Sequence, residues 1–153
     1  MPIQDIRKSG DPVLKIKADP VPKIDRKIKN LLDTMAQTME HANGVGLAAP
    51  QIGVSLRVIV VDAGDGLLEL VNPEIIEAVG CETAMEGCLS VPGFYGDVER
   101  CTTVKVKAMD RNGNPFVVEG EGLLARALQH EIDHLDGVLF IEKATSIYRP
   151  EPE

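Results

Sequence analysis

The order of helix-type and strand-type segments constrains the fold of this chain more than any other feature. A run of predicted strands lies between two predicted helices, without the strand–helix alternation that builds a parallel sheet. In residues 25–41, apolar residues recur every three or four positions after the capping residue Asp25, which indicates a helix. A second helix is predicted at 122–136, with Gly137 as its end. We therefore expect an α+β fold, with antiparallel sheets around the second helix and one helix near the N-terminus.

The predicted strands are runs of apolar and β-branched residues without helical periodicity. They cover 56–61, 67–71, 74–81, 101–109 and, after the turn signal Asn112-Gly113, 116–118. Asn72-Pro73 is expected to separate the second strand from the third. The Gly/Ala-rich residues 44–53 should form a loop, and residues 3–22, with three prolines, should be extended or irregular.

Length and charge narrow the class of protein. The 153 residues fit one domain, which we expect at 1–147, followed by a flexible tail at 148–153. The net charge of −8 argues against DNA or another nucleic acid as a partner. No apolar run approaches the roughly 20 residues of a membrane span, and no signal peptide is visible, so no membrane partner is expected. Three cysteines without an export signal favour a metal or catalytic role over disulfides.

The segment that carries chemistry is H-E-x-x-H at 130–134, inside the second predicted helix. At a spacing of four, His130 and His134 stand about 40° apart on one helix face and can bind one metal ion. Glu131 lies about 100° away from His130, where it can flank a metal-activated water as a general base. Chance is a poor explanation, because the chain has only three histidines and two of them are used here.

Two faces of this helix have different compositions. Leu124, Leu128, Ile132 and Leu135 form an apolar stripe that should face the core. Leu123 and Ala127 share the side of the histidines, so the metal would sit beside a partly apolar wall.

The third metal ligand has to come from another part of the chain. Phe140 occupies the position of a third histidine in metzincins, and few glutamates follow the helix, so the ligand should lie upstream. The strongest candidate is Cys88, because the glycine before it lets the backbone come close to an ion or substrate. Cys81 and Cys101 are better explained as small buried apolar residues.

A third feature is the glycine-rich segment 44–51, which ends in Gln51 and lacks the features of a phosphate loop. The amide of Gln51 could donate a hydrogen bond to a developing oxyanion. The alternative is that Gln51 is an ordinary polar residue on the surface.

Together these segments resemble the peptide deformylase family. Its motifs G-x-G-L-A-A-x-Q, E-G-C-L-S and Q-H-E-x-D-H are matched, in this order, by residues 44–51, 86–90 and 129–134. Their joint occurrence is far more specific than H-E-x-x-H alone. The resemblance implies a metal-dependent hydrolase that removes the N-formyl group from the N-terminal methionine of nascent polypeptides and releases formate.

The resemblance also assigns residues. It implies Cys88, His130 and His134 as metal ligands and Glu131 as the general base and then the acid. The Gln51 side chain and the Leu89 backbone N–H would form the oxyanion hole. The substrate peptide would be held by the backbone of Val45 and Gly46 and by that near Gly87, as an added strand. Glu86 would pair with Arg100, with ordinary surface charge as the alternative, whereas Tyr95 and Arg126 receive no role.

For the cofactor, the residues alone do not separate zinc from iron. The resemblance implies one Fe²⁺ per chain, with Zn²⁺, Ni²⁺ or Co²⁺ able to replace it. N-formyl-Met peptides are the implied substrates, and the ribosome is a transient partner, although docking through a basic C-terminal helix is not expected because that helix is missing. A bacterial-type cytoplasmic location is implied; an organelle stays open in principle, but no transit peptide is visible.

Two rival interpretations follow from the residues. A different metallohydrolase, such as a small peptidase, would need a downstream His or Glu ligand, which the sequence does not offer. A structural zinc site would usually need four protein ligands. Only His41, expected to be a plain exposed residue, and two cysteines without a C-x-x-C pair remain for that purpose.

Overall fold

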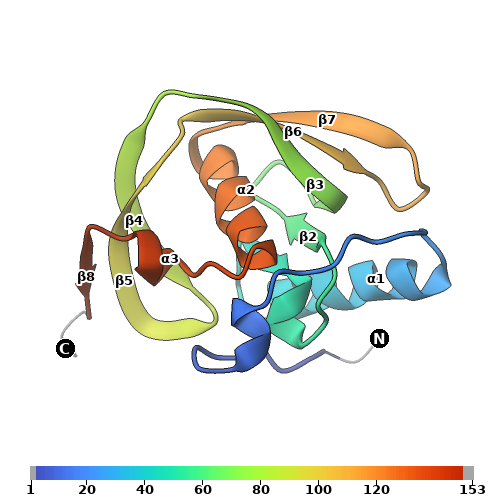
Figure 1. The fold of residues 1–153 in the computed structure, drawn as a ribbon, viewed down its shortest axis with the longest axis horizontal. Helices are drawn as coiled ribbons and strands as arrows, with labels where there is room; N and C mark the ends of the chain where they lie inside the picture. Colours follow the sequence, from blue (N-terminus) through green and yellow to red (C-terminus); the bar gives the residue numbers. More distant parts are fainter. Residues whose placement is uncertain (1–2, 150–153) are drawn as a thin grey trace.

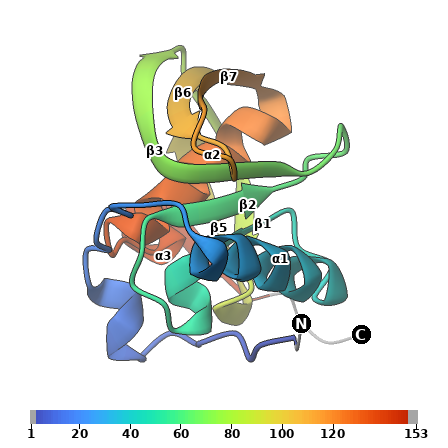
Figure 2. The ribbon, with the colours of Figure 1, turned by 90° about the vertical axis from the view of Figure 1, so that its right-hand side faces the viewer.

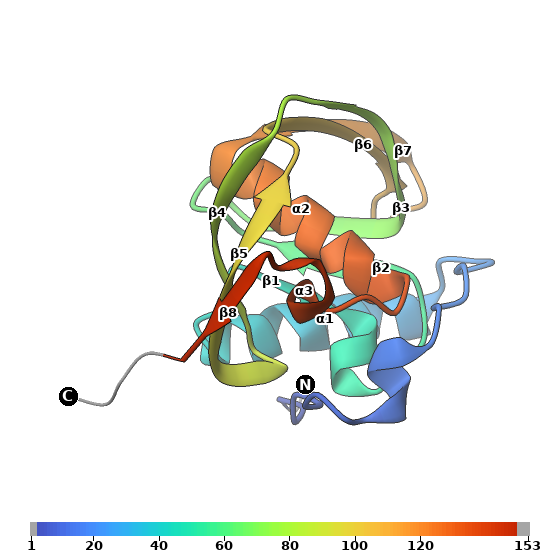
Figure 3. The same cartoon turned by 60° about the vertical axis from the view of Figure 1, so that its left-hand side comes forward.

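The computed structural model of the chain describes residues 3–149 and shows a helix enclosed by two sheets (Figures 1 and 3). The elements, in chain order, are η1 (Pro12–Lys15), α1 (Arg26–His41), β1 (Gly46–Ala48), η2 (Ala49–Ile52), β2 (Val58–Val61), β3 (Leu68–Val79), β4 (Glu82–Cys88), β5 (Val91–Arg100), β6 (Thr103–Met109), β7 (Pro115–Glu121), α2 (Gly122–Leu135), α3 (Phe140–Lys143) and β8 (Ser146–Tyr148).

The strands form two antiparallel sheets. One has five strands in the order β1-β2-β3-β6-β7, and the other has three in the order β4-β5-β8. In Figure 3, β3, β6 and β7 arch over α2, while β4 and β5 pass along its side. Figure 2 shows α1 below the strands, on the side away from this arch. The expected α+β class is confirmed, with antiparallel sheets around the second long helix.

The main core lies between α2 and the five-stranded sheet. The alternating residues Val104, Val106 and Ala108 of β6 are buried against Leu128 and Ile132 of α2. A second cluster packs α1 against β1 and β2, and a third lies under β5 and α3. Burial of these apolar surfaces, at roughly 25 cal/mol per Å², fixes where α2 sits and therefore where its histidines point.

Both predicted helices are confirmed. The Asp25 side chain accepts a hydrogen bond from the Ile28 N–H at 3.2 Å and caps α1. After α2, Gly137 has φ +75°, and a Cβ there would lie 2.6 Å from the Lys15 carbonyl oxygen. The predicted hairpin between β6 and β7 is also present, although β7 is longer than expected. No helix in residues 3–149 is long and apolar enough to cross a membrane.

The predicted break at Asn72-Pro73 is wrong. Strand β3 continues from Leu68 to Val79, with a shift in register between Val71 and Glu74. Asn72 adopts φ +54°, a conformation that Asn tolerates better than most residues. Its side chain accepts from the Val21 N–H at 2.8 Å and donates to the Val21 carbonyl at 2.9 Å. The strand therefore absorbs the irregularity as a bulge that also holds the N-terminal segment.

The structure also differs from the predicted elements in several short or polar segments. Strands β4, β5 and β8 were not predicted, and the expected loop at 44–53 contains β1 and η2. The irregular segment 3–22 includes the 3-10 turn η1. Tyr148, expected to begin the tail, is the last residue of β8, and residues 150–153 lie outside the described part. Cys81 is exposed, which corrects its expected burial, because it lies where β3 passes into β4.

Candidate active site

The two histidines of H-E-x-x-H lie one turn apart on a buried face of α2. Their ring centroids are 5.1 Å apart, and both side chains are almost fully buried. Phe140, at the position where a metzincin would carry a third histidine, stacks against the His130 ring at 6.2 Å. The helix therefore offers two imidazoles and no third ligand of that kind, as the sequence predicted.

Cys88 completes the cluster from the last position of β4. Its Sγ lies 3.3 Å from His134 Nε2, and the potential ligand atoms of Cys88, His130 and His134 all lie within 4.8 Å of one another. Sγ also accepts hydrogen bonds from the Ser90 backbone N–H at 3.4 Å and from Gln51 Nε2 at 3.7 Å. The sulfur is therefore held by contacts with three other residues of the site.

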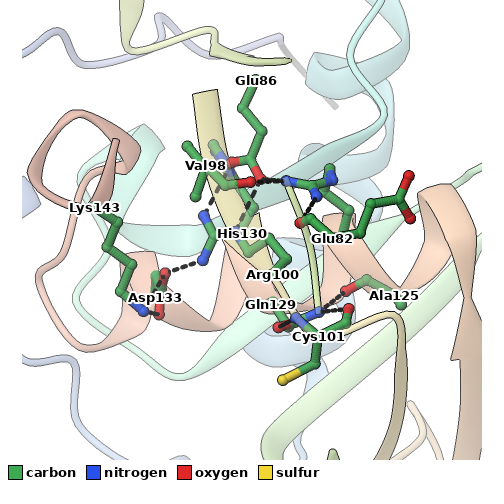
Figure 4. Close-up of polar contacts among 11 residues, drawn as sticks. Glu82, Glu86, Val98, Arg100, Cys101, Ala125, Gln129, His130, Asp133 and Lys143 are labelled. Carbon is green, nitrogen blue, oxygen red and sulfur yellow. Dashed lines mark hydrogen bonds and ion pairs between the residues drawn. The ribbon is translucent and has the colours of Figure 1, made fainter. Parts of the chain in front are cut away.

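A buried carboxylate orients one of the histidines. His130 Nδ1 lies 2.9 Å from Glu86 Oε1, and since an ionised carboxylate only accepts, Nδ1–H is the donor and Nε2 is left for a ligand (Figure 4). Arg100 forms a bidentate pair with Glu86 at 2.9 and 3.0 Å and also contacts Asp133 on α2. Burial alone would raise the pKa of Glu86, but His130 and Arg100 hold it well below its ordinary value.

The two histidines have opposite electrostatic environments. Burial acts to lower the pKa of His130, but its contacts with Cys88 and Glu86 raise the pKa to about 10. For His134, burial and the nearby His130 and Arg100 charges lower the pKa well below its usual value. A bound cation would oppose the protonation of His130, because metals bind the neutral imidazole.

Glu131 faces the cavity beside this cluster. The side chain is 5% exposed, and burial raises its pKa to about 7. Its Oε1 has no hydrogen-bond partner among residues 3–149. A Cβ added to Gly46 would lie 2.6 Å from Glu131 Oε2, so the glycine makes room for the carboxylate. A carboxyl group with a pKa near neutrality can both take up and release a proton at physiological pH.

Gln51 is not the surface residue that was the alternative interpretation, because it is 1% exposed. Its Oε1 accepts from the Ala48 backbone N–H at 2.9 Å, which fixes the orientation of the amide. Its Nε2 then donates toward Ser90 Oγ at 3.1 Å and toward Cys88 Sγ. The donor end of Gln51 is therefore held next to the thiol.

These groups line a cavity of about 530 Å³, large enough for a small peptide end. Its wall includes eight of the nine predicted site residues, and the ninth, His134, lies behind them in contact with Cys88. Apolar side chains complete the wall: Met85, Val91, Phe94, Leu123 and Ala127.

Comparison with known proteins agrees with this geometry. The family described as polypeptide deformylase matches residues 3–149. The peptide deformylase of Pelotomaculum thermopropionicum is 60% identical over 153 residues, covering all of this chain and 99% of that protein. The chain belongs to the peptide deformylase family. The resemblance seen in the sequence is thus confirmed.

Solved structures of the peptide deformylase family show the same fold. The crystal structure of the Thermotoga maritima peptide deformylase has a TM-score of 0.93 at 45% identity and covers 95% of this chain and 99% of that chain. The Synechococcus elongatus peptide deformylase, solved in complex with actinonin, has a TM-score of 0.91 at 45% identity, with coverage of 95% and 81%. The family is metal-dependent and acts on the formylated ends of nascent polypeptides.

The donor set fits a metal of the kind that a peptide deformylase requires. One thiol and two imidazoles converge from two elements, and this combination suits divalent transition metals. Three protein ligands leave room for water, as in catalytic rather than structural sites.

Several contacts around the site were not predicted from the sequence. Arg126 was given no role, yet it lines the cavity and bonds Glu86. Asp133 contacts Arg100 and Lys143, and Ser90 contacts both Gln51 and Cys88. Only the spacing of Arg126, four residues before His130, signalled that it shares the histidine face.

Proposed function

We propose that this enzyme removes the formyl group at the cavity beside Cys88, His130 and His134, which act as the three protein ligands of its metal ion. The observation that carries the proposal is the convergence of their donor atoms within 4.8 Å, next to the buried carboxyl group of Glu131, whose Oε1 has no hydrogen-bond partner among residues 3–149. A metal ion held by these three residues would supply Lewis-acid activation of water and of the formyl carbonyl.

Glu131 is the proposed general base and acid. Its buried carboxyl group, with a pKa of about 7, takes the proton of the attacking water and then gives it to the leaving amine. The products are formate and a free N-terminal methionine. The formyl carbonyl carries a hydrogen atom where other acyl groups carry a carbon substituent. A narrow site can therefore exclude larger acyl groups and internal peptide bonds.

The proposed oxyanion hole consists of the Gln51 amide and the Leu89 backbone N–H. Gln51 is held with Nε2 beside the Cys88 sulfur, and Leu89 follows Cys88 directly, so both donors border the place of reaction. Donors that are already in place stabilise a developing charge without reorganising.

The proposed peptide-binding edges are the backbone of Val45 and Gly46 and that near Gly87. Within residues 3–149, strand β1 pairs only with β2 and ends the five-stranded sheet, so its other edge is available to an added strand. Gly87 borders the opposite side of the cavity on β4. A substrate peptide entering between them would bridge the two sheets through main-chain hydrogen bonds.

We further infer that the native metal is Fe²⁺, with Zn²⁺, Ni²⁺ or Co²⁺ as possible replacements. A thiolate-bound ferrous ion would make the enzyme sensitive to oxygen, because both Cys88 and the metal can be oxidised. The proposal also includes one catalytic domain at 1–147, a cytoplasmic location and transient contact with the ribosome, where formylated chains emerge.

Formate release from formyl-Met-Ala-Ser tests the proposal, with acetyl-Met-Ala-Ser as the control substrate. The protein is purified without oxygen, and its metal content is measured on the same sample. We expect formate from the first peptide only and about one metal ion per chain. No release by iron-, nickel- or cobalt-loaded protein would refute the assignment.

A further inference from the structure

The buried carboxylate of Glu86 accepts four hydrogen bonds, two at each oxygen. Oε1 accepts from Arg100 Nη2 at 3.0 Å and from His130 Nδ1 at 2.9 Å. Oε2 accepts from Arg100 Nε at 2.9 Å and from Arg126 Nη1 at 2.6 Å. A carboxylate has about four lone-pair positions, so Arg126 fills the last one.

Arg126 also ties three elements together. From α2, its Nη1 donates to the Val98 carbonyl of β5 at 2.9 Å, and its Nη2 donates to the Glu82 carbonyl of β4 at 2.8 Å. The third contact is Glu86 itself, which stands two residues before Cys88 on β4. The guanidinium thus fixes the position of β4, which carries the thiol, relative to α2, which carries the imidazoles.

The location of Arg126 suits this task. It precedes His130 by four residues, so both side chains stand on the same face of α2. The Arg126 side chain is 13% exposed, and that of Glu86 is 5% exposed. Because water has little access, a lost hydrogen bond is not readily replaced, and Glu86 Oε2 would be left with Arg100 Nε as its donor, which loosens the carboxylate that orients His130.

We propose that Arg126 is a positioning residue for the metal site, acting through Glu86 on His130 and through β4 on Cys88. This inference rests on the ligands proposed above. It explains why Glu86 contacts two arginines although the pair with Arg100 alone is already bidentate. Lysine could keep the charge, but it lacks the planar fork that reaches a carboxylate and two carbonyls at once.

Metal release provides the test. Wild-type, Arg126→Met and Arg126→Lys proteins are loaded with Co²⁺ without oxygen, and excess chelator is added well below the unfolding temperature. Loss of the thiolate-to-cobalt absorption follows the metal. Loss of a partner that orients a ligand typically costs 10–100-fold in metal affinity. We expect about 10-fold faster release from Arg126→Met and an intermediate rate from Arg126→Lys.

Arg111→Met is the matched control. Like Arg126, Arg111 makes three hydrogen bonds, although all three go to the carboxylates of Glu69 and Asp33, and it does not line the cavity. Its release rate should stay within about twofold of wild type, even where the melting temperature falls. If Arg126→Met does not fold, Arg126→Lys and Arg126→Gln take its place, and faster release is expected from both.

Two results would overturn the inference. One is an unchanged release rate in every folded Arg126 variant, and the other is an equal acceleration by Arg111→Met, which would mark a general loss of stability. Failure of the wild type to take up Co²⁺ would have a different meaning: it would refute the proposed ligand set, and this inference with it.

Discussion

The two faces of α2 are built from different interactions. On one face, Leu128 and Ile132 are buried against the β6 side chains, and shape and apolar area decide the fit. On the other face, His130 and Arg126 meet partners from β4 and β5 through hydrogen bonds and charges. The first face holds the helix in place, and the second uses that fixed position to arrange reactive groups. Substitutions on the two faces should therefore separate stability from chemistry.

Glu131→Gln should give the largest effect. The amide has nearly the same shape but cannot take up or deliver a proton, so kcat should fall by about 10⁴-fold, the upper end for a group that acts as base and acid. Metal content and melting temperature should match wild type. The measurement is formate release with metal analysis on the same sample; retained activity would show that another group is the base.

Leu128→Ala is the corresponding change on the apolar face. Leu128 is fully buried, and the cavity left behind should lower the free energy of unfolding by about 2–5 kcal/mol. Chemical denaturation measures this loss. At a temperature where the variant stays folded, kcat should remain within about threefold of wild type. A large loss of kcat in the folded variant would contradict the separation of the two faces.

Gly46→Ala tests whether the space beside Gly46 on β1 is needed for the Glu131 carboxylate. A methyl group at this position would press on the Glu131 carboxylate, and a displacement of about 1 Å can cost about 10²-fold in rate. We expect this loss in kcat/KM, with metal still bound. If the rate is unchanged, the contact between Gly46 and Glu131 does not position the base.

Leu123→Ala should have the smallest effect on stability and provides a direct comparison with Leu128→Ala. Leu123 is 55% exposed and lines the cavity on the histidine side of α2. The free energy of unfolding should change by less than about 0.5 kcal/mol. KM for formyl-Met-Ala-Ser should rise several-fold, because apolar contact with the substrate is lost. A stability loss equal to that of Leu128→Ala would mean that the exposed leucine also belongs to the core.

The same contrast explains what could be predicted from the sequence. The apolar stripe and the H-E-x-x-H face of α2 are local patterns, and the spacing of their residues along the chain is enough to locate both. Strands β4 and β5 lack a clear apolar alternation, since Glu86 and Arg100 occupy buried positions as a charged pair. The spacing of residues alone could not select Cys88, the third proposed ligand, because it meets His134 across 46 positions of sequence. The role of Arg126 depends on backbone carbonyls of two strands, and every residue has such a carbonyl, so the sequence does not identify these partners.

That long separation between Cys88 and its partners has a consequence for biosynthesis. A chain lengthens at about 5–20 residues per second, so the segment from the thiol to the second histidine takes roughly 2–9 s to make. For nearly all of this interval the growing polypeptide carries the thiol of Cys88, a proposed metal ligand, but lacks both imidazoles. Its thiol can meet oxidants or other soft metals before the proposed metal site can form, and binding of a metal by all three proposed ligands requires that α2 has been synthesised and folded.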